Sequence, residues 1–332
     1  MLTNPACPVC GATEWTVVGE RTYRRPASLD GKQQKPLRVL FDVWAPGEQE
    51  FRVRFAGCKR CAMMIYLPRP GPADLEAKYR ALAQYGDATP SLGEAPRRTR
   101  LRSKRLFDLM TPRLGRPVDR SRILDFGGGD GRLLLTFAEA GAACDVVDYC
   151  EEMIPGVRHV GRTVDALAGE PSYDAIICSH VVEHLAEPLP VLRQLVGNLA
   201  PDGVIYVEVP VEMVKRMPAG TEPVTHCNFF IPESLAALME RAGCRLISCK
   251  LTAYPHPNGS WMLCAGALAT PGAAPASATG AGLPALRRYL DPPLPFLIRL
   301  RTIVWRSLPR LATRKLLGKA RSLMPARAAA RP

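Results

Sequence analysis

The sequence has no apolar run long enough to cross a membrane and no visible export signal. In 332 residues, no stretch approaches the roughly 18 uninterrupted apolar residues that a transmembrane helix needs. The segment from Met1 to Cys7 lacks the basic region followed by an apolar one that marks a secretory signal. The chain has 11 cysteines, an odd number that argues against a disulfide framework. These absences predict a cytoplasmic protein with reduced thiols.

The globular part of the sequence also lacks a strong surplus of either charge. The net charge is +13, but residues 284–332 contain twelve Lys or Arg and one acid, Asp291, and so carry +11 of it. The remaining residues carry +2, and no basic groove is evident in them. This distribution argues against DNA or RNA binding by the body of the protein. With 47% apolar residues, the chain can still bury a full core.

The third glycine of the dinucleotide-binding fingerprint is missing. The apolar stretch from Arg122 to Phe126 runs into glycines and then into a helical pattern, so a strand enters a tight turn and leaves as a helix. Such a turn brings backbone N–H groups and the positive end of a helix against a ligand. A fingerprint that starts at Gly127 would need glycine at position 132, where the chain has Arg132. The glycines here read G-x-G-x-G, with Asp125 two residues before the first; a glycine turn without a ligand is the alternative.

From this turn onward the sequence alternates between strand and helix patterns. Such alternation predicts a parallel sheet covered by helices on both faces, with ligands at the carboxyl ends of the strands. The last two strands have no helix between them, so we expect an antiparallel hairpin there. The predicted strands are 123–126, 143–147, 173–179, 204–209, 245–251 and 261–268, and the helices lie near 132–140, 189–199 and 232–242.

Two C-x-x-C pairs precede this region. Their members are Cys7, Cys10, Cys58 and Cys61. Each pair can place two thiolates on one metal ion, and four thiolates complete a tetrahedral zinc site without an open position, so we interpret the site as structural. Chance pairs and a redox role are the alternatives, although no βαβ pattern surrounds the cysteines. Alternating residues at 38–44 and 50–55 predict that the spacer folds back as a hairpin.

The segment between the cysteine pairs and the glycine turn has a helical pattern. One helix begins with Pro72 and has acids in its first turn, and a basic helix follows over 99–114. From this linker Tyr79 and Tyr85 could reach over the cofactor site. Packing is the alternative role for both tyrosines.

Acids and histidines follow several strands at the predicted ligand edge. Asp148 ends the second strand, where a carboxylate can accept hydrogen bonds from ribose hydroxyls. His180 follows strand 173–179, and we expect Glu183 and His184 in the first turn of a helix, with both histidines on one side. His226 lies on a later loop. These histidines suit a general base or a substrate ligand, and capping of a strand end is the alternative.

The motifs together resemble the class I S-adenosylmethionine (SAM) methyltransferases. They are Leu124-Asp-Phe-Gly-Gly-Gly-Asp-Gly, His180-Val-Val-Glu-His-Leu, Pro201-Asp-Gly203 and His226-x-x-Phe-Phe-x-Pro-Glu-Ser-Leu. The four-cysteine module narrows the resemblance to bacterial methyltransferases with a zinc-binding head, a group that includes the nucleotide-sugar C-methyltransferases. The resemblance covers about residues 5–268.

The resemblance implies an α/β fold with a Rossmann-like seven-stranded methyltransferase sheet, a small zinc-binding β module before it and a basic helical tail after it. The implied domains are a zinc-binding module (1–68), a helical linker or lid (69–120), a methyltransferase domain (121–270), a low-complexity linker (271–283) and a basic amphipathic tail (284–332). The implied cofactors are SAM and structural Zn²⁺. The implied SAM-binding residues are Asp125, Gly127, Gly128, Gly129, Asp148 and Asp165, and the implied catalytic residues are His226, His180 and His184.

One residue departs from the pattern of the sugar C-methyltransferases. In that group the histidine that corresponds to His226 is preceded by a glutamate, which serves with it in proton abstraction, whereas this chain has Thr225. C- and O-methylation of a sugar, a nucleotide sugar or a related small metabolite therefore both stay open. An RNA methyltransferase and a non-catalytic SAM-fold scaffold are the alternatives.

The basic tail mixes large apolar residues with arginines, most clearly at 294–305 and 311–323. Such a segment can lie in the interface of an anionic membrane, which would place the protein peripherally at the inner membrane surface. A helix that docks a partner protein and a solvated basic tail are the alternatives.

Overall fold

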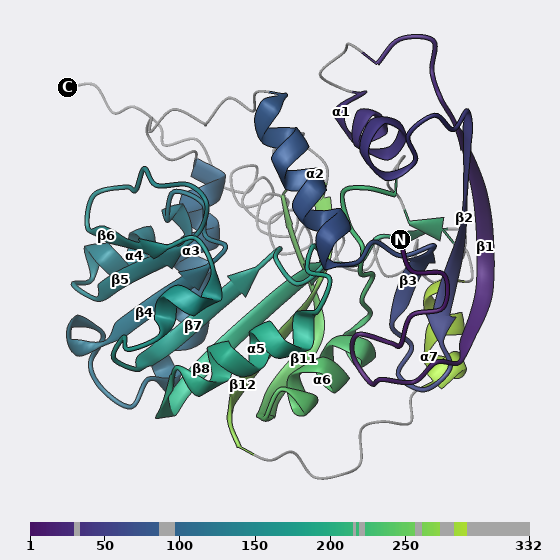
Figure 1. Ribbon diagram of the computed structural model, residues 1–332. Helices are drawn as coiled ribbons and strands as arrows, with labels where there is room; N and C mark the ends of the chain where they lie inside the picture. The colour runs from purple at the N-terminus through teal and green to yellow at the C-terminus, as the bar shows by residue number, and fades with distance from the viewer. Residues whose placement is uncertain are drawn as a thin grey trace, which may run out of the picture.

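The computed structural model describes residues 1–29, 34–85, 97–214, 217–218, 223–255, 261–272 and 282–290. A large sheet and a small N-terminal sheet lie beside each other, with helix α2 (Pro72–Gln84) above the junction between them (Figure 1). No helix in these ranges is long and apolar enough to cross a membrane.

The large sheet has seven strands in the order β11-β12-β8-β7-β4-β5-β6. Strands β4, β5, β6, β7 and β8 pair in parallel, and β12 is antiparallel to both of its neighbours. The predicted fold class and the terminal hairpin are therefore confirmed. The strand bounds are Arg122–Phe126 (β4), Ala143–Val147 (β5), Val157–Gly161 (β6), Tyr173–Ser179 (β7), Leu199–Pro210 (β8), Cys244–Pro255 (β11) and Trp261–Pro271 (β12). Sequence reasoning missed β6, a short edge strand that is nowhere fully buried.

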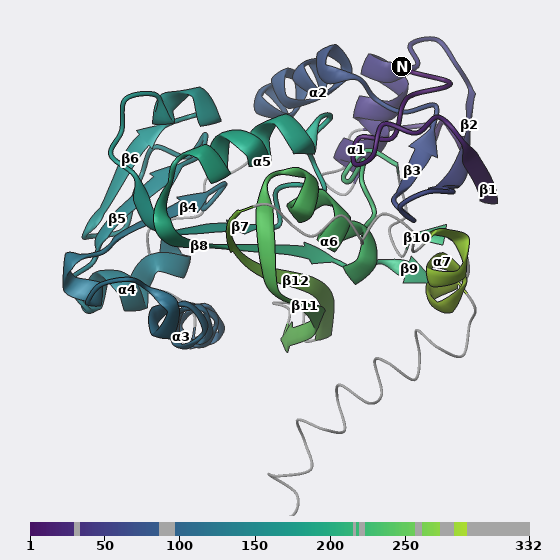
Figure 2. The ribbon, with the colours of Figure 1, turned by 90° about the horizontal axis from the view of Figure 1, so that it is seen from below.

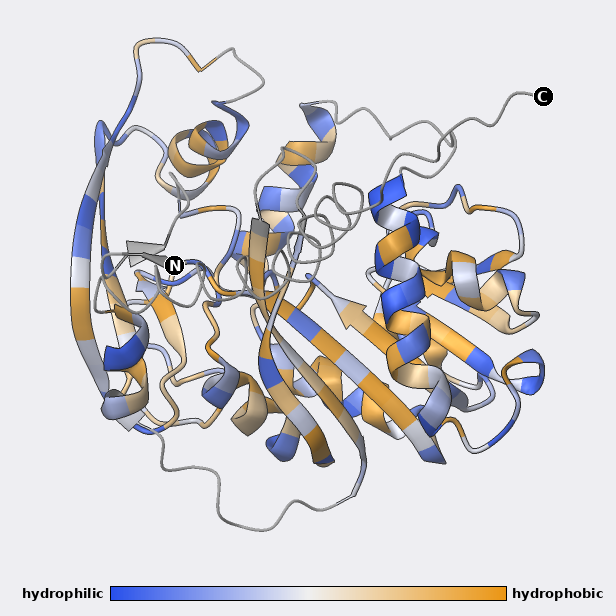
Figure 3. Ribbon diagram, turned by 180° about the vertical axis from the view of Figure 1, so that it is seen from behind, coloured by the Kyte–Doolittle hydropathy of each residue, from blue (hydrophilic) through white to orange (hydrophobic). Residues whose placement is uncertain are grey.

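Helices cover both faces of the large sheet (Figure 2). On one face α3 (Arg97–Met110), η5 (Arg132–Leu134) and α4 (Leu135–Glu139) enclose a core with Phe137 at its centre. On the other face α5 (Pro188–Gly197) and α6 (Pro232–Arg241) share a larger core with the small sheet. Apolar stretches run along the central strands, whereas α3 alternates between hydrophilic and hydrophobic segments, as a helix with one buried face does (Figure 3).

The small sheet is an antiparallel meander of β1 (Trp15–Arg24), β2 (Glu50–Cys58) and β3 (Met64–Leu67). The predicted hairpin between 38–44 and 50–55 is wrong, because β2 pairs with β1 and residues 35–44 are helical. Helix α1 (Lys35–Arg38) starts around Pro36, and η2 (Val39–Trp44) continues it. Three consecutive apolar residues of η2 are buried, which a half-buried strand would not allow, so tertiary packing overrides the alternation.

Backbone and side-chain hydrogen bonds join the small sheet to the large domain. Met64 in β3 and Phe229 exchange two backbone hydrogen bonds of 3.1 and 2.9 Å. Arg69 is 3% exposed, and its guanidinium donates to the carbonyls of Cys227 (2.7 Å) and Ala186 (2.8 Å) and to the Asn228 side chain (2.8 Å). The head thus holds the loop that carries His226.

The start of the predicted tail packs on the small sheet. Helix α7 (Gly282–Leu290) contacts β2 and buries Leu286 and Leu290 against the head, while Arg288 pairs with Glu233 of α6. The segments 294–305 and 311–323 and most of the linker at 271–283 lie outside the described residues. The remaining short elements are η3 (Thr111–Arg113), η4 (Val118–Arg120), η6 (Val164–Leu167), β9 (Met213–Val214) and β10 (Met217–Pro218).

Candidate active site and four-cysteine cluster

The glycine turn after β4 is packed so closely that two of its glycines cannot carry a side chain. A Cβ on Gly128 would lie 2.5 Å from the carboxyl group of Asp125, and one on Gly127 would lie 2.3 Å from Val181. Gly127 and Gly129 also have positive φ values of 73° and 57°, which glycine adopts without strain. A Cβ on Gly129 would meet nothing within 4 Å, so this side of the turn is open toward a ligand.

Asp125 lies at the end of β4 with 1% of its surface exposed. Neither of its carboxylate oxygens has a hydrogen-bond partner among the described residues. Burial raises the pKa of Asp125 to about 7, against the opposing effect of Arg102 and with a smaller contribution from Asp148. A buried carboxylate with no partner is costly, and a cationic ligand group would relieve that cost.

Asp148 follows the tip of β5, the strand next to β4. Its two carboxylate oxygens accept backbone hydrogen bonds from Gly129 (3.0 Å) and Cys150 (2.8 Å). These bonds fix the carboxylate beside the glycine turn and leave lone pairs for hydroxyl donors. Asp165 lies in η6 and its carboxylate is 3.4 Å from the Gln194 side chain of α5. Its assignment beside the adenine stays a prediction.

The segment after β7 is a turn, and the predicted helix around Glu183 and His184 is wrong. Helix α5 begins only at Pro188, because proline suits the first helical turn and disfavours helix in the residue before it. The backbone of the turn is held instead by the loop that carries His226. The Glu183 carbonyl accepts hydrogen bonds from the amides of Cys227 (3.0 Å) and Asn228 (3.1 Å).

This docking brings together three side chains that are far apart in the sequence. The rings of His184 and His226 lie edge to face with their centroids 4.6 Å apart. Glu183, His184 and His226 each offer one oxygen or nitrogen within 4.8 Å of those of the other two. The three residues, here called the Glu183–His184–His226 cluster, form a single polar group at the carboxyl edge of the sheet.

A carboxylate that sequence reasoning missed holds His226. Glu212, just beyond the end of β8, places its Oε2 2.6 Å from Nδ1 of His226. The acid that Thr225 does not supply therefore comes from the preceding loop. An acid two residues beyond a central strand, at the predicted ligand edge, is the sequence signal that could have found it.

His180 is not a member of the Glu183–His184–His226 cluster but contacts it through Glu183. It has a φ of 60°, its Nδ1 lies 3.2 Å from Oε1 of Glu183, and its Nε2 contacts the Tyr254 hydroxyl. Arg102 lies over the Tyr254 ring at 4.3 Å and pairs with the buried Glu208 at 2.8 Å. His180 thus positions Glu183 from behind, whereas His184 lines a cavity.

Burial and charge set the protonation of the cluster. Burial would raise the pKa of Glu183, but the hydrogen bond from His180 and the positive potential of the imidazoles lower it on balance. Burial also lowers the pKa of His184 to about 4, against the attraction of Glu183 and with help from His226 and Lys78. At neutral pH, Glu183 is ionised and His184 is neutral.

A cavity of about 960 Å³ lies beside α2 and is lined by His184 of this cluster. Its wall includes His184 and Leu185 on one side, Tyr149, which follows Asp148, and Tyr79 from α2. Tyr79 and Tyr149 stack with centroids 6.3 Å apart and an interplanar angle of 26°. Tyr79 thus lines the cavity, and its reach over the ligand site stays a prediction. Tyr85 packs instead against Arg38, whose guanidinium lies 3.9 Å from its ring centroid.

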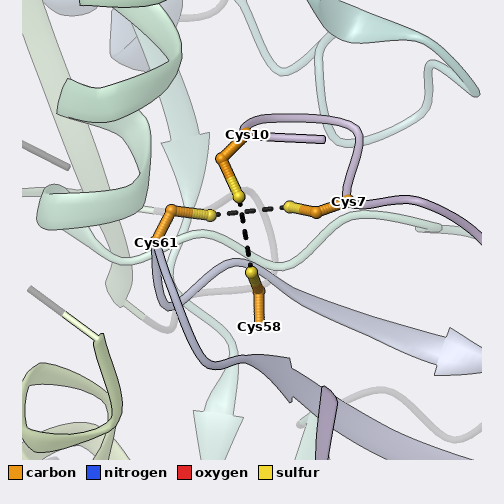
Figure 4. Close-up of side chains that lie close together, drawn as sticks. All are labelled: Cys7, Cys10, Cys58 and Cys61. Atoms are coloured by element: carbon orange, nitrogen blue, oxygen red, sulfur yellow. Dashed lines mark hydrogen bonds between the residues drawn. The ribbon is translucent and has the colours of Figure 1, made fainter. Parts of the chain in front are cut away.

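The four head cysteines meet in one buried cluster (Figure 4). The sulfur atoms of Cys7 and Cys61 and those of Cys10 and Cys58 lie 3.5 Å apart, and the two pairs cross. Four thiolates on a tetrahedral zinc ion have sulfur atoms about 3.8 Å apart, given Zn–S bonds of about 2.3 Å. The cluster therefore has the shape of a closed four-thiolate site.

A glycine turn with acids at the tips of two adjacent central strands defines a nucleotide-type cofactor site. Residues 98–249 match the family model described as a methyltransferase domain. This part of the chain is thus similar to methyltransferase domains, and the match supports the predicted enzyme class.

Known proteins that are similar to this chain include three methyltransferases. The C-methyltransferase NovU of Streptomyces niveus is 28% identical over 255 residues, which are 73% of this chain and 56% of NovU. A ubiquinone biosynthesis O-methyltransferase of Xanthomonas axonopodis pv. citri is 28% identical over 38% of this chain and 63% of its own. The chain thus spans less than two thirds of the length of either. A Burkholderia thailandensis 1,6-didemethyltoxoflavin-N1-methyltransferase with bound S-adenosylhomocysteine aligns with a TM-score of 0.48 and 22% identity, over 66% of this chain and 96% of its own.

Proposed function

We propose that this protein transfers a methyl group from SAM to a small molecule bound in the cavity beside α2. The observation that carries the proposal is the wall of this cavity, which joins Tyr149, next to the cofactor acid Asp148, to His184 and its cluster. Tyr149, the neighbour of a proposed cofactor-binding acid, and His184, a member of the cluster proposed to remove a proton, therefore line one space. The acceptor would be a sugar, a nucleotide sugar or a related metabolite, as the resemblance of the sequence motifs to nucleotide-sugar C-methyltransferases implies.

The cofactor half uses charge as well as shape. The unpartnered carboxylate of Asp125 suits the ammonium group of the methionine portion of SAM, because an opposite charge stabilises a buried acid. The glycine turn lets the ligand approach the backbone, and Asp148 is placed to accept the ribose hydroxyls. We also assign Asp165 to the cofactor site, where it would lie beside the adenine of SAM.

The acceptor half must position a nucleophile and remove its proton. The methyl group of SAM is already activated by its sulfonium, so the acceptor atom attacks the methyl carbon in line while the C–S bond breaks. The acceptor proton goes to the Glu183–His184–His226 cluster, in which Glu212 holds the His226 ring. A carboxylate on Nδ1 makes an imidazole more basic at Nε2, which serves proton abstraction from either O–H or C–H.

We also propose that Cys7, Cys10, Cys58 and Cys61 hold a structural Zn²⁺ ion, and that the protein acts in the cytoplasm, where thiols stay reduced. The crossing of the two sulfur pairs and their 3.5 Å spacings support the metal. The site supplies folding energy to the head, and with four protein ligands it leaves no position for a substrate.

The test is a mass-spectrometric screen with isotopically labelled SAM. Keto and hydroxy nucleotide sugars and dihydroxy aromatic acids are incubated with wild type, Glu212→Gln and His226→Ala. The turnover of the accepted substrate should fall by about 10²- to 10⁴-fold in both variants. Glu187→Gln is the matched control, since Glu187 is an exposed acid that follows the same turn. Unchanged turnover in both variants would remove the pair from the mechanism, and a wild type that does not bind SAM in calorimetry would favour a scaffold.

A further inference from the structure

The Glu183–His184–His226 cluster combines one carboxylate with two imidazoles on the cavity side of the fold. Their three candidate ligand atoms lie within 4.8 Å of one another. Two imidazoles and one carboxylate on one side of a metal ion form a ligand set that leaves open coordination positions for a substrate. The cluster therefore has the composition of a metal site that binds a further ligand.

Each of the three side chains is oriented by a bond on its far side. Nδ1 of His184 lies 2.8 Å from the Thr225 carbonyl, and Nδ1 of His226 lies 2.6 Å from Glu212. Oε1 of Glu183 lies 3.2 Å from Nδ1 of His180. Histidine ligands of metal ions donate their other ring N–H to a carbonyl or a carboxylate in this way, which fixes the tautomer and the ring.

A second, independent observation points to a missing ligand. Oε2 of Glu183 is buried and has no hydrogen-bond partner among the residues that the structure describes, although the side chain is only 1% exposed. A buried carboxylate oxygen without a donor costs several kcal/mol unless a cation or a donor reaches it. An ion in the cluster would supply the missing partner.

A neighbouring cluster lacks this feature. His180, Glu208 and Cys264 also lie within 4.8 Å of one another. Glu208, however, already accepts hydrogen bonds from Arg102 (2.8 Å), Tyr206 (2.8 Å) and Thr252 (3.1 Å). Its charge is compensated by arginine, so no cation is needed there.

We propose that Glu183, His184 and His226 bind a divalent first-row transition cation through Oε2 and the two Nε2 atoms. Coordination through these atoms leaves the three outer bonds intact and requires the ligand atoms to draw together to about 3 Å. The carboxylates of Glu183 and Glu212 give this region a negative charge that outweighs Lys78, whose ammonium group donates to the carbonyls of Val224 and Thr225. This site has mixed oxygen and nitrogen donors, so its metal preference differs from that of the four-thiolate site of the head, which favours zinc.

This inference rests on the proposed function, since it assigns the way in which the same cluster acts on the acceptor. The open positions of the cation bind an acceptor that carries two adjacent oxygens, such as a vicinal diol or a hydroxy ketone. A bound cation would lower the pKa of a coordinated hydroxyl, so that its proton would leave to water while the imidazole nitrogens are metal ligands; without the cation the cluster itself accepts the proton, as proposed above. The deprotonated oxygen would then bond to the methyl carbon as the C–S bond breaks, and neutral S-adenosylhomocysteine would leave.

The experiment measures cation binding directly, with Mn²⁺ as the probe. Full-length protein with zinc in the head is titrated with MnCl₂, and free Mn²⁺ is followed by electron paramagnetic resonance. We expect saturable binding by wild type, and at least about 100-fold weaker binding by Glu183→Gln and His184→Gln. Glu212→Gln removes only an outer bond and should weaken binding by about 10- to 100-fold. Glu187→Gln should bind as wild type does.

SAM affinity is measured by calorimetry on the same samples, which separates the two proposals. Absence of saturable Mn²⁺ binding by wild type, or equal binding by the folded Glu183→Gln and His184→Gln variants, overturns the cation site. SAM binding in the same samples would leave the proposed function standing. Saturable Mn²⁺ binding without SAM binding would instead support the cation site and overturn the methyltransferase activity. Circular dichroism identifies the folded variants, and His184→Gln, at the cavity wall, is the one expected to perturb packing least.

Discussion

The cofactor half and the acceptor half of the proposed active site are built in different ways. The cofactor half comes from one continuous stretch, residues 122–150, in which the turn, Asp125 and Asp148 contact one another directly. The acceptor half joins the turn at 182–185 to Glu212 and His226, and Tyr79 from α2 lines the cavity beside it. One half depends on local geometry, and the other on contacts between distant segments.

The two halves also differ in which sheet supports them. The loop of His226 is held by the head, through Met64 paired with Phe229 and through Arg69 bonded to Cys227 and Asn228. The glycine turn belongs to the large sheet alone. We infer that the head, and the metal in it, supports acceptor chemistry rather than cofactor binding.

The largest expected effect tests that division. Cys10→Ser removes one thiolate from the head cluster, so we expect loss of zinc, displacement of the His226 loop and a fall in turnover of about 100-fold or more, as for a misplaced catalytic group. SAM affinity should stay within about threefold, because the glycine turn keeps its own contacts. Elemental analysis, turnover and calorimetry measure the three effects. Cys249→Ser is the control, since Cys249 lies in β11 and bonds to Pro232. A parallel loss of SAM binding in Cys10→Ser would break the comparison.

The second prediction concerns a substitution in the cofactor half. Gly128→Ala places a methyl group 2.5 Å from the carboxyl group of Asp125, so the turn must open and SAM affinity should fall by about 100-fold. Calorimetry measures it. Gly197→Ala, at the end of α5 with nothing within 4 Å of the added Cβ, should bind SAM normally. Unweakened binding by Gly128→Ala would show that the turn is not the cofactor site.

The third prediction concerns pH and Asp125. In the free protein burial raises its pKa to about 7, so below pH 7 the carboxyl group is mostly protonated and must lose its proton to pair with the SAM ammonium group. SAM affinity should therefore fall as the pH drops below 7, by up to about tenfold per pH unit. Asp125→Asn should bind SAM weakly and without this dependence. Calorimetry between pH 5.5 and 8 checks it, and a pH dependence that persists in Asp125→Asn would assign it to another group.

The smallest effect concerns the contact between the halves. Tyr79 of the lid helix stacks on Tyr149 of the cofactor half, so Tyr79→Ala should weaken ligand binding by about 2- to 13-fold, as expected for one aromatic pair of about 0.5–1.5 kcal/mol. Tyr85→Ala is the matched control, because Tyr85 follows the same helix but packs on Arg38. KM values for SAM and for the acceptor measure the effect. Equal KM changes in the two variants would show that the stack has no specific role.

The sequence predicted the cofactor half better than the acceptor half. The glycine turn and Asp148 follow from a strand, a turn and the next strand, and parallel strands bring their carboxyl ends to one edge. Glu212 was missed because its place two residues beyond β8 marks an acid at the ligand edge but does not identify it as the partner of His226. The helix expected at Glu183 was wrong because Pro188 starts the helix later and because the carbonyl of Glu183 is bonded across to Cys227 and Asn228. The strand expected at 38–44 failed because packing buries three successive apolar residues there.

The sequence by itself determined most of the strands and helices of the large sheet, the pairing of the four cysteines in two motifs and the position of the glycine turn. Hydrophobic periodicity and the spacing of glycines and cysteines are local properties of the sequence. In a parallel sheet they also predict where a residue lies, because the carboxyl ends of the strands meet at one edge. Only the tertiary structure decided which carboxylate holds His226, which tyrosine covers the cavity and which histidine stands behind Glu183. Those pairings depend on how the head and the loop of His226 pack across the sheet. Packing between distant segments produces no periodic pattern in the sequence.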